Sequence, residues 1–266
     1  MGEFLAQGGK ASVLGVTSSG IFLHNPRGQV CFLSGEAYRG PITINLQCTV
    51  HFKALFKVGE GCLIYDGGLS FSGCQVVIPS DTPVWEPLPI RFGQGDTRLA
   101  LQRGMQLAKG VVGGYRKGLF FPFLDHLVHH SEDLAEEQAC ALLPGWQMGS
   151  ELFDWLSGLI GLGRGLTPAG DDFLCGFLLA RHALNPSSAD DLSERLAAAA
   201  QGKTTALSAA LIRCAAHGQG DERLLDALHW MAGDGDRQDA RARLLSYGSS
   251  SGVDALAGML AALLLC

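Results

Sequence analysis

The stretch GLGRGLTPAGDD, residues 161–172, leads directly into FLCGFLLARHAL, residues 173–184. The second part is apolar on nearly every side of a helical projection, which is typical of a helix buried at the centre of a domain. Thr167-Pro168 marks the start of this helix, because Thr is a good N-cap and Pro suits the first helical position. We therefore expect a helical domain built around this segment.

The glycine-rich part of this stretch has the pattern of an anion-binding turn. Alternate glycines permit backbone conformations closed to other residues and let a ligand approach the chain. A turn of this kind before a helix presents N–H groups and the positive end of the helix dipole. A nearby Arg adds a two-pronged donor for a carboxylate or phosphate. The residues predicted to bind substrate here are Gly163, Arg164, Gly165, Thr167 and Gly170.

Asp171 and Asp172 stand between this turn and the apolar helix. Acids near a helix N-terminus gain at most about 1 kcal/mol from the dipole, which does not offset the burial of two carboxylates. Hydrogen bonds, a cation or a proton must satisfy them. We predict both as catalytic residues. The alternative is that one acid accepts hydrogen bonds from the loop itself while the other is solvated.

Two further helix starts place polar residues beside apolar runs. One follows an Ala-rich segment, and the other precedes the last helix of the chain. Each could be a simple cap or a back-bonded hydroxyl. If the three starts meet, they form one pocket, and the additional substrate-binding residues are Lys203, Thr204, Thr205, Ser250, Ser251 and Asp254.

The bulk properties restrict the class of protein. The net charge of −6 and the absence of a long basic run argue against a nucleic-acid groove. The eight cysteines include no CxxC pair and are typical of reduced core residues. No signal peptide or membrane-length apolar run is evident, so a cytoplasmic protein is expected. Asp125-His126 and His129-His130 have the helical i, i+3 and i+4 spacing of metal ligands, but no third ligand is evident, so we predict surface or packing histidines and no metal site.

The chain changes character near residue 95. Short β-rich runs with Gly and Pro turns precede that point, and helical periodicity follows it. We predict an α+β fold, with an antiparallel β domain at 1–95, sheet or small barrel, and an α-helical domain at 96–266. Expected strands cover 12–16, 20–25, 29–34, 42–46, 62–66 and 74–79, and expected helices cover 99–112, 131–143, 150–160, 173–184, 192–216, 224–231 and 253–265.

The motif GLGRGLTPAGDDFLCGFL resembles the signature of the AllH family, which includes a subunit of oxamate carbamoyltransferase. The later segments KTTALS and GSSSGVDALAGML strengthen the resemblance. It implies a role in allantoin (purine) catabolism, in which oxalurate and phosphate give oxamate and carbamoyl phosphate. It also implies FdrA-like and AllG-like partner subunits, and a small anionic ligand such as carbamoyl phosphate, oxamate or oxalurate.

The residues suit this chemistry. Carbamoyl transfer passes through an anionic tetrahedral species, which N–H donors stabilise. An acid of the Asp171/Asp172 pair would orient the amide nitrogen or act as acid/base once burial has raised its pKa. Two alternatives stay open: a Mg²⁺-dependent hydrolase or phosphotransferase that uses the same pair, and a non-catalytic scaffold subunit. The sequence specifies no cofactor, and Mg²⁺ belongs to the first alternative.

Overall fold

The computed structural model describes residues 4–5, 8–47, 49–93, 96–113, 118–130, 136–147, 149, 151–185 and 191–265. The chain divides into two compact units, residues 1–87 and 88–266. The first unit is β-rich and the second is helical, so the predicted α+β class is confirmed. Six cysteines lie in the described part, and all six are free thiols. Within the described residues, no helix combines the length and apolarity needed to cross a bilayer.

The β-rich unit is one curled sheet with the strand order β4-β3-β2-β1-β5-β6-β7. Its elements are β1 Gly9–Val16, β2 Gly20–His24, β3 Val30–Ser34, β4 Thr43–Asn45, α2 Phe52–Leu55, β5 Gly61–Tyr65, β6 Gly68–Ser70 and β7 Gln75–Val77. Every neighbouring pair is antiparallel except β3–β4, which is parallel because residues 35–42 carry the chain back before β4 begins. Alternate residues of the strands, among them Val13, Ile21, Leu23 and Ile64, form the core of this unit.

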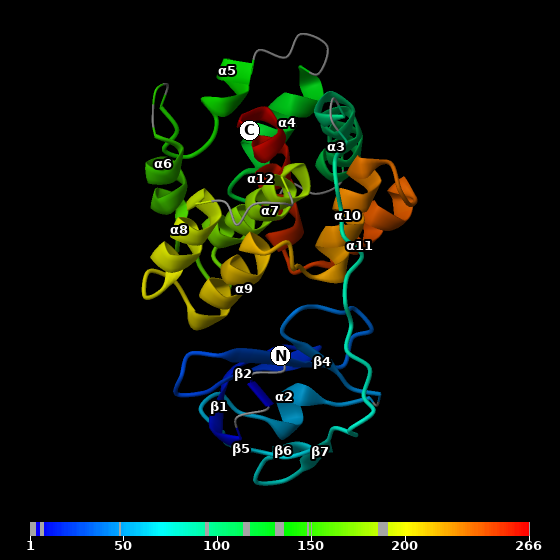
Figure 1. Ribbon diagram of the computed structural model, residues 1–266, viewed down its shortest axis with the longest axis vertical. Helices are drawn as coiled ribbons and strands as arrows, with labels where there is room; N and C mark the ends of the chain where they lie inside the picture. Colours follow the sequence, from blue (N-terminus) through cyan, green and yellow to red (C-terminus); the bar gives the residue numbers. More distant parts are fainter. Residues whose placement is uncertain are drawn as a thin grey trace. The chain divides into compact units, whose positions relative to one another are not determined.

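The helical unit is arranged around two central helices, α7 and α12, which lie at its middle in Figure 1. Its elements are α3 Thr97–Val112, α4 Phe121–His129, α5 Glu136–Cys140, α6 Leu152–Leu159, α7 Ala169–Leu184, α8 Asp191–Ala200, α9 Ala206–Ala216, α10 Glu222–Ala232, α11 Arg237–Ser246 and α12 Ser251–Leu265. Residues 169–184 thus form the central buried helix that the sequence predicts.

Glycines allow α7 and α12 to cross with their backbones nearly touching. A Cβ added to Gly176 would lie 1.9 Å from the carbonyl oxygen of Ala255, and one added to Gly258 would lie 1.9 Å from that of Phe173. No side chain fits between backbones at such distances. The first turns of the two helices are therefore held in a fixed relation, and this relation positions the acids described below.

Some helix boundaries differ from the sequence-based expectation. The Ala-rich segment 192–216 is two helices, α8 and α9, because Gly202 adopts a φ of 77° and Thr205 caps a new start. Helices α4 and α11 were not expected. In α4, Pro122 occupies the first turn, where its missing N–H costs no hydrogen bond. The predicted helix start at 131–133 lies outside the described residues.

Candidate functional site

The loop that joins α6 to α7 is built on three glycines. Gly161, Gly163 and Gly165 have φ values of 77°, 121° and 102°, a region that other residues rarely adopt. Close approach adds a second requirement for two of them. A Cβ on Gly161 would lie 2.8 Å from the carbonyl oxygen of Lys203, and one on Gly163 would lie 2.8 Å from the backbone nitrogen of Ala169. The predicted special turn is therefore present in the structure.

The predicted cap of α7 is wrong by one residue. Pro168, with φ −56° and ψ 147°, occupies the N-cap position, and no side chain caps this helix. The hydroxyl of Thr167 lies instead 3.4 Å from the hydroxyl of Ser251 at the start of α12. Proline fixes its own φ and leaves Thr167 outside the helix, so the Thr side chain is available for contacts between helices.

Asp171 is buried and fully engaged. Its exposed fraction is 1%, the N–H of Gly161 donates to its Oδ1 at 2.8 Å, and the hydroxyl of Thr204 donates to its Oδ2. The carboxylate thus ties the glycine loop to α7 and to the start of α9. The sequence predicts Asp171 either as a catalytic acid or as an acceptor of hydrogen bonds from the loop. Its contacts support the second interpretation.

These contacts narrow the predicted anion-binding surface. The N–H of Gly161 serves Asp171, and the N–H of Gly170 donates to the carbonyl oxygen of Leu162 at 2.8 Å. Gly170 is thus not available as a donor to a substrate. Within the described part of the chain, the N–H groups of Gly163, Arg164 and Gly165 have no hydrogen-bond partner, and all three residues are exposed. The free donors lie in the outer part of the loop.

Asp172 is also buried, with 3% of its surface exposed, but its partners are two hydroxyls. Burial raises the pKa of Asp172 well above its usual range, and the negative charges of Asp254 and Asp171 raise it further. Hydrogen bonds from Ser251 and Thr167 oppose this rise. Burial is the largest of these causes, so the surroundings of Asp172 favour the protonated form of its carboxyl group.

Asp254, in the first turn of α12, is 0% exposed. The N–H of Phe120 donates to its Oδ1 at 3.1 Å, whereas its Oδ2 has no hydrogen-bond partner among the described residues. Burial raises the pKa of Asp254 to about 6, against the lowering effect of the Phe120 and Leu119 N–H groups and the Ser250 hydroxyl. Gly118 is close by, since a Cβ there would lie 2.8 Å from Oδ1.

The starts of α7, α9 and α12 meet, which is the condition under which the sequence predicts one site. Besides the Thr204–Asp171 bond, the hydroxyl of Thr205 donates to the carbonyl oxygen of Leu166 at 2.6 Å and accepts from the N–H of Ser208 at 3.0 Å. These bonds join α9 to the glycine loop. The Thr167–Ser251 contact joins the loop to α12. All thirteen predicted residues therefore lie on the glycine loop or at the starts of α7, α9 and α12.

The two predicted cations are peripheral. The side chains of Arg164 and Lys203 belong to exposed residues, and no ion pair of either is found in the described portion of the chain. Lys203 contributes through its backbone carbonyl, which packs against Gly161. Neither side chain can be assigned to the buried acids.

Sequence reasoning missed the residues that complete the site from elsewhere in the chain. The Gly118–Phe120 turn contacts Asp254, and Phe120 also stacks on Phe173 at 4.3 Å between ring centroids. Tyr247 lies near Asp172, and burial raises its pKa well above the usual range. No local pattern in the sequence distinguishes these residues from ordinary core and loop positions.

Arg223 and Asp221 hold the segment before α12. The guanidinium contacts both carboxylate oxygens, at 2.8 and 2.9 Å, and its Nη1 lies 3.3 Å from the carbonyl oxygen of Ser246. The ring of Tyr247 lies 5.0 Å from the guanidinium carbon. This paired arrangement fixes the chain just before Ser250 and Ser251.

Metal-ligating side chains do not gather in the described residues. No group of three or more His, Cys, Asp or Glu suited to a metal ion is found there. The rings of His126 and His130 are tilted by 31° with their centroids 4.4 Å apart, and His129 lies 3.6 Å from Asp125 on an exposed surface.

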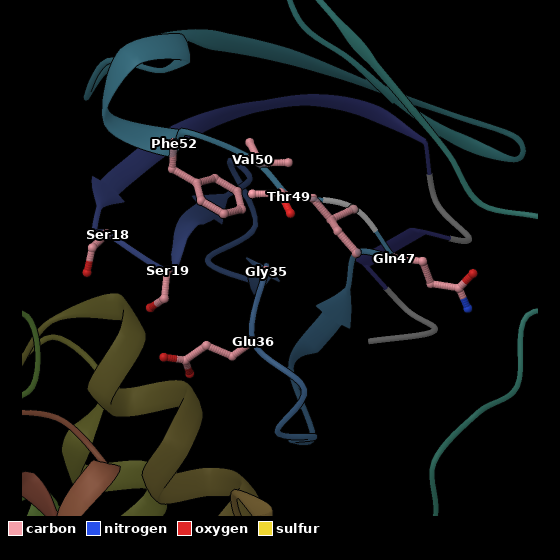
Figure 2. A pocket seen from close by; sticks show the side chains of 9 residues that line it. Ser18, Ser19, Gly35, Glu36, Gln47, Thr49, Val50 and Phe52 are labelled. Atoms are coloured by element: carbon pink, nitrogen blue, oxygen red, sulfur yellow. The ribbon is translucent and has the colours of Figure 1, made fainter.

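A separate hollow of about 390 Å³ lies in the β-rich unit. Figure 2 shows Ser18, Ser19 and Glu36 at this hollow, together with the ring of Phe52. Its lining is mostly polar, and none of the predicted site residues contributes to it. We therefore place the candidate site at the three helix starts.

The fold and the site define an α+β protein whose helical unit buries three acids where three helix starts meet. Residues 159–263 match the model of the family described as Oxamate carbamoyltransferase subunit AllH. The match confirms the resemblance seen in the sequence, and it spans all the predicted site residues. No curated protein and no solved structure matches the chain.

Proposed function

We propose that this chain is a subunit of an oxamate carbamoyltransferase that converts oxalurate and phosphate to oxamate and carbamoyl phosphate. The family match supports the subunit assignment. The observation that carries the proposal is the pair of buried carboxyl groups of Asp172 and Asp254, in the first turns of two helices. They lie beside a turn whose outer N–H groups have no partner in the part of the chain that the structure describes. A carbamoyl substrate needs both an acid and an anion-binding surface.

The reaction defines what the site must do. A phosphate oxygen forms a bond to the ureido carbonyl carbon, and the bond from that carbon to the oxamate nitrogen breaks. The nitrogen leaves with a proton, so a general acid accelerates the step. Asp172 suits this role because burial raises the pKa of its carboxyl well above the usual range, which favours the protonated form that a general acid needs.

The remaining groups have distinct tasks. The outer N–H groups of Gly163, Arg164 and Gly165 would hold the phosphate or the substrate carboxylate. Asp171, whose two oxygens are already occupied, would be a positioning residue that holds the loop and Thr204 in place. The proposed catalytic role of the acid pair thereby narrows to Asp172.

FdrA-like and AllG-like subunits are the proposed partners, since the matched family is described as a subunit. The test is reconstitution of the complex, with oxamate and carbamoyl phosphate measured after addition of oxalurate and phosphate. Asp172→Asn should lower turnover by roughly 100-fold or more, the usual contribution of a general acid. Asp234→Asn, at an exposed position, is the matched control and should leave turnover unchanged.

Two results would contradict the proposal. A wild-type complex that does not turn over oxalurate removes the substrate assignment. Turnover of Asp172→Asn within about twofold of wild type, with intact assembly, points instead to the scaffold role.

A further inference from the structure

Asp254 differs from the other two acids in its hydrogen bonding. Both oxygens of Asp171 receive a donor, and Asp172 interacts with two hydroxyls. On Asp254, the N–H of Phe120 donates to Oδ1, and the Leu119 N–H and the Ser250 hydroxyl also lower the pKa of this acid. Its Oδ2 nevertheless has no hydrogen-bond partner among the described residues, although the side chain is fully buried. A buried acceptor without a donor is costly, so such an atom is ordinarily satisfied by a ligand or a water.

The rigidity of the helix crossing keeps this oxygen in place. Gly176 and Gly258 bring the backbones of α7 and α12 into contact, which leaves the first turn of α12 little freedom to move. The Phe120 N–H holds Oδ1, so the direction of Oδ2 is also set. Asp254 therefore presents a fixed acceptor beside Asp172.

The surroundings favour a neutral donor over a cation. The first turns of α7 and α12 carry the positive ends of two helix dipoles, which disfavour an added positive charge. The half-buried residues Thr167, Ser250 and Ser251 place uncharged hydroxyls against Asp172 and Asp254. An uncharged N–H group of a small polar ligand fits both conditions.

We propose that Asp254 Oδ2 accepts a hydrogen bond from the amide nitrogen of a primary-amide (carbamoyl) ligand, the nitrogen that Asp172 faces. The inference rests on the proposed function for the identity of the ligand and adds a residue to it. Asp254 binds and orients the nitrogen, while Asp172 supplies the proton. Any ligand of this subsite must therefore present an N–H group to Asp254 Oδ2.

The probe pair is oxamate and pyruvate, which differ by an amino group in place of a methyl group. Calorimetric titration of the full-length chain, alone and with its partner subunits, measures both affinities. We expect oxamate to bind at least about 10-fold more tightly than pyruvate, because a site built to accept an N–H discriminates against an analogue that lacks it. N,N-dimethyloxamate, which has no N–H, should behave like pyruvate and tests the idea without any variant.

Asp254→Asn tests the residue itself. Because the Phe120 N–H requires an acceptor, the Asn oxygen takes that position and its NH₂ replaces Oδ2. Two N–H groups would then face each other, so the preference for oxamate should disappear. Asp234→Asn, an exposed control, should keep it. Circular dichroism verifies that each variant is folded.

Equal affinity for oxamate and pyruvate, no binding of oxamate, or a preference retained in Asp254→Asn would each overturn the inference. Turnover of oxalurate is scored separately. If the wild-type complex turns over oxalurate but binds oxamate and pyruvate equally, the proposed function is supported and the Asp254 subsite is contradicted. If the complex is inactive but prefers oxamate through Asp254, the subsite is supported and the proposed reaction is contradicted.

Discussion

Asp254→Asn also has a large expected effect on stability, since it removes a carboxylate that the fold buries completely. The substitution preserves the shape of the side chain and an acceptor for the Phe120 N–H. What it removes is the cost of ionising a carboxyl group in the interior. The free energy of unfolding should therefore rise at neutral pH, in contrast to most substitutions of buried residues.

The magnitude follows from the pKa. Burial raises the pKa of Asp254 from 3.8 to about 6 in the folded protein. The folded state thus binds the proton more tightly than the unfolded state, and wild-type stability falls as pH rises through this interval. A shift of about 2 units corresponds to about 3 kcal/mol. Asp172 is shifted in the same direction, so the titration belongs to the pair rather than to one residue.

Urea unfolding of wild type and variant between about pH 3.5 and about pH 7.5 measures this term. The stability of the variant relative to wild type should increase by about 3 kcal/mol across the series, with most of the change between the two pKa values. Asp234→Asn, at an exposed position, should show no such trend. If the difference in free energy of unfolding between variant and wild type stays constant with pH, the reasoning is refuted. A carboxyl group whose pKa differs between the folded and unfolded states must make the stability depend on pH.

Two substitutions test the framework of the site by the same unfolding measurement. Gly258→Ala places a methyl group 1.9 Å from the Phe173 carbonyl oxygen and should cost roughly 1–3 kcal/mol, whereas Gly158→Ala, with open space around it, should be neutral or slightly stabilising. Equal effects at the two glycines would argue against the close crossing. Thr204→Val keeps the shape of the side chain but deprives Asp171 of a donor, and should cost about 1–3 kcal/mol. A Thr204→Val protein as stable as wild type would mean that this bond is not formed in solution.

The site was predictable in parts and for identifiable reasons. The glycine loop, the two acids after it and the other two helix starts each leave a local signature of a few residues. Their convergence does not, because hydrogen bonds such as that from Thr204 to Asp171 join residues 33 positions apart. Because long-range contacts leave no local pattern, the sequence could not assign different roles to the two acids. Asp171 and Asp172 are neighbours in sequence but contact different partners.

The amino-acid sequence alone determined the division into a β-rich and a helical part, the buried central helix and the special backbone of the loop, since these depend on periodicity and on the conformational freedom of individual residues. Only the tertiary structure decided that Asp171 is satisfied and that one oxygen of Asp254 has no hydrogen-bond partner among the described residues. The bond from Phe120 to Asp254 spans 134 residues. Burial and hydrogen-bond supply, which set the charge of a carboxyl group, arise from packing between helices and are not encoded in any short stretch of the chain.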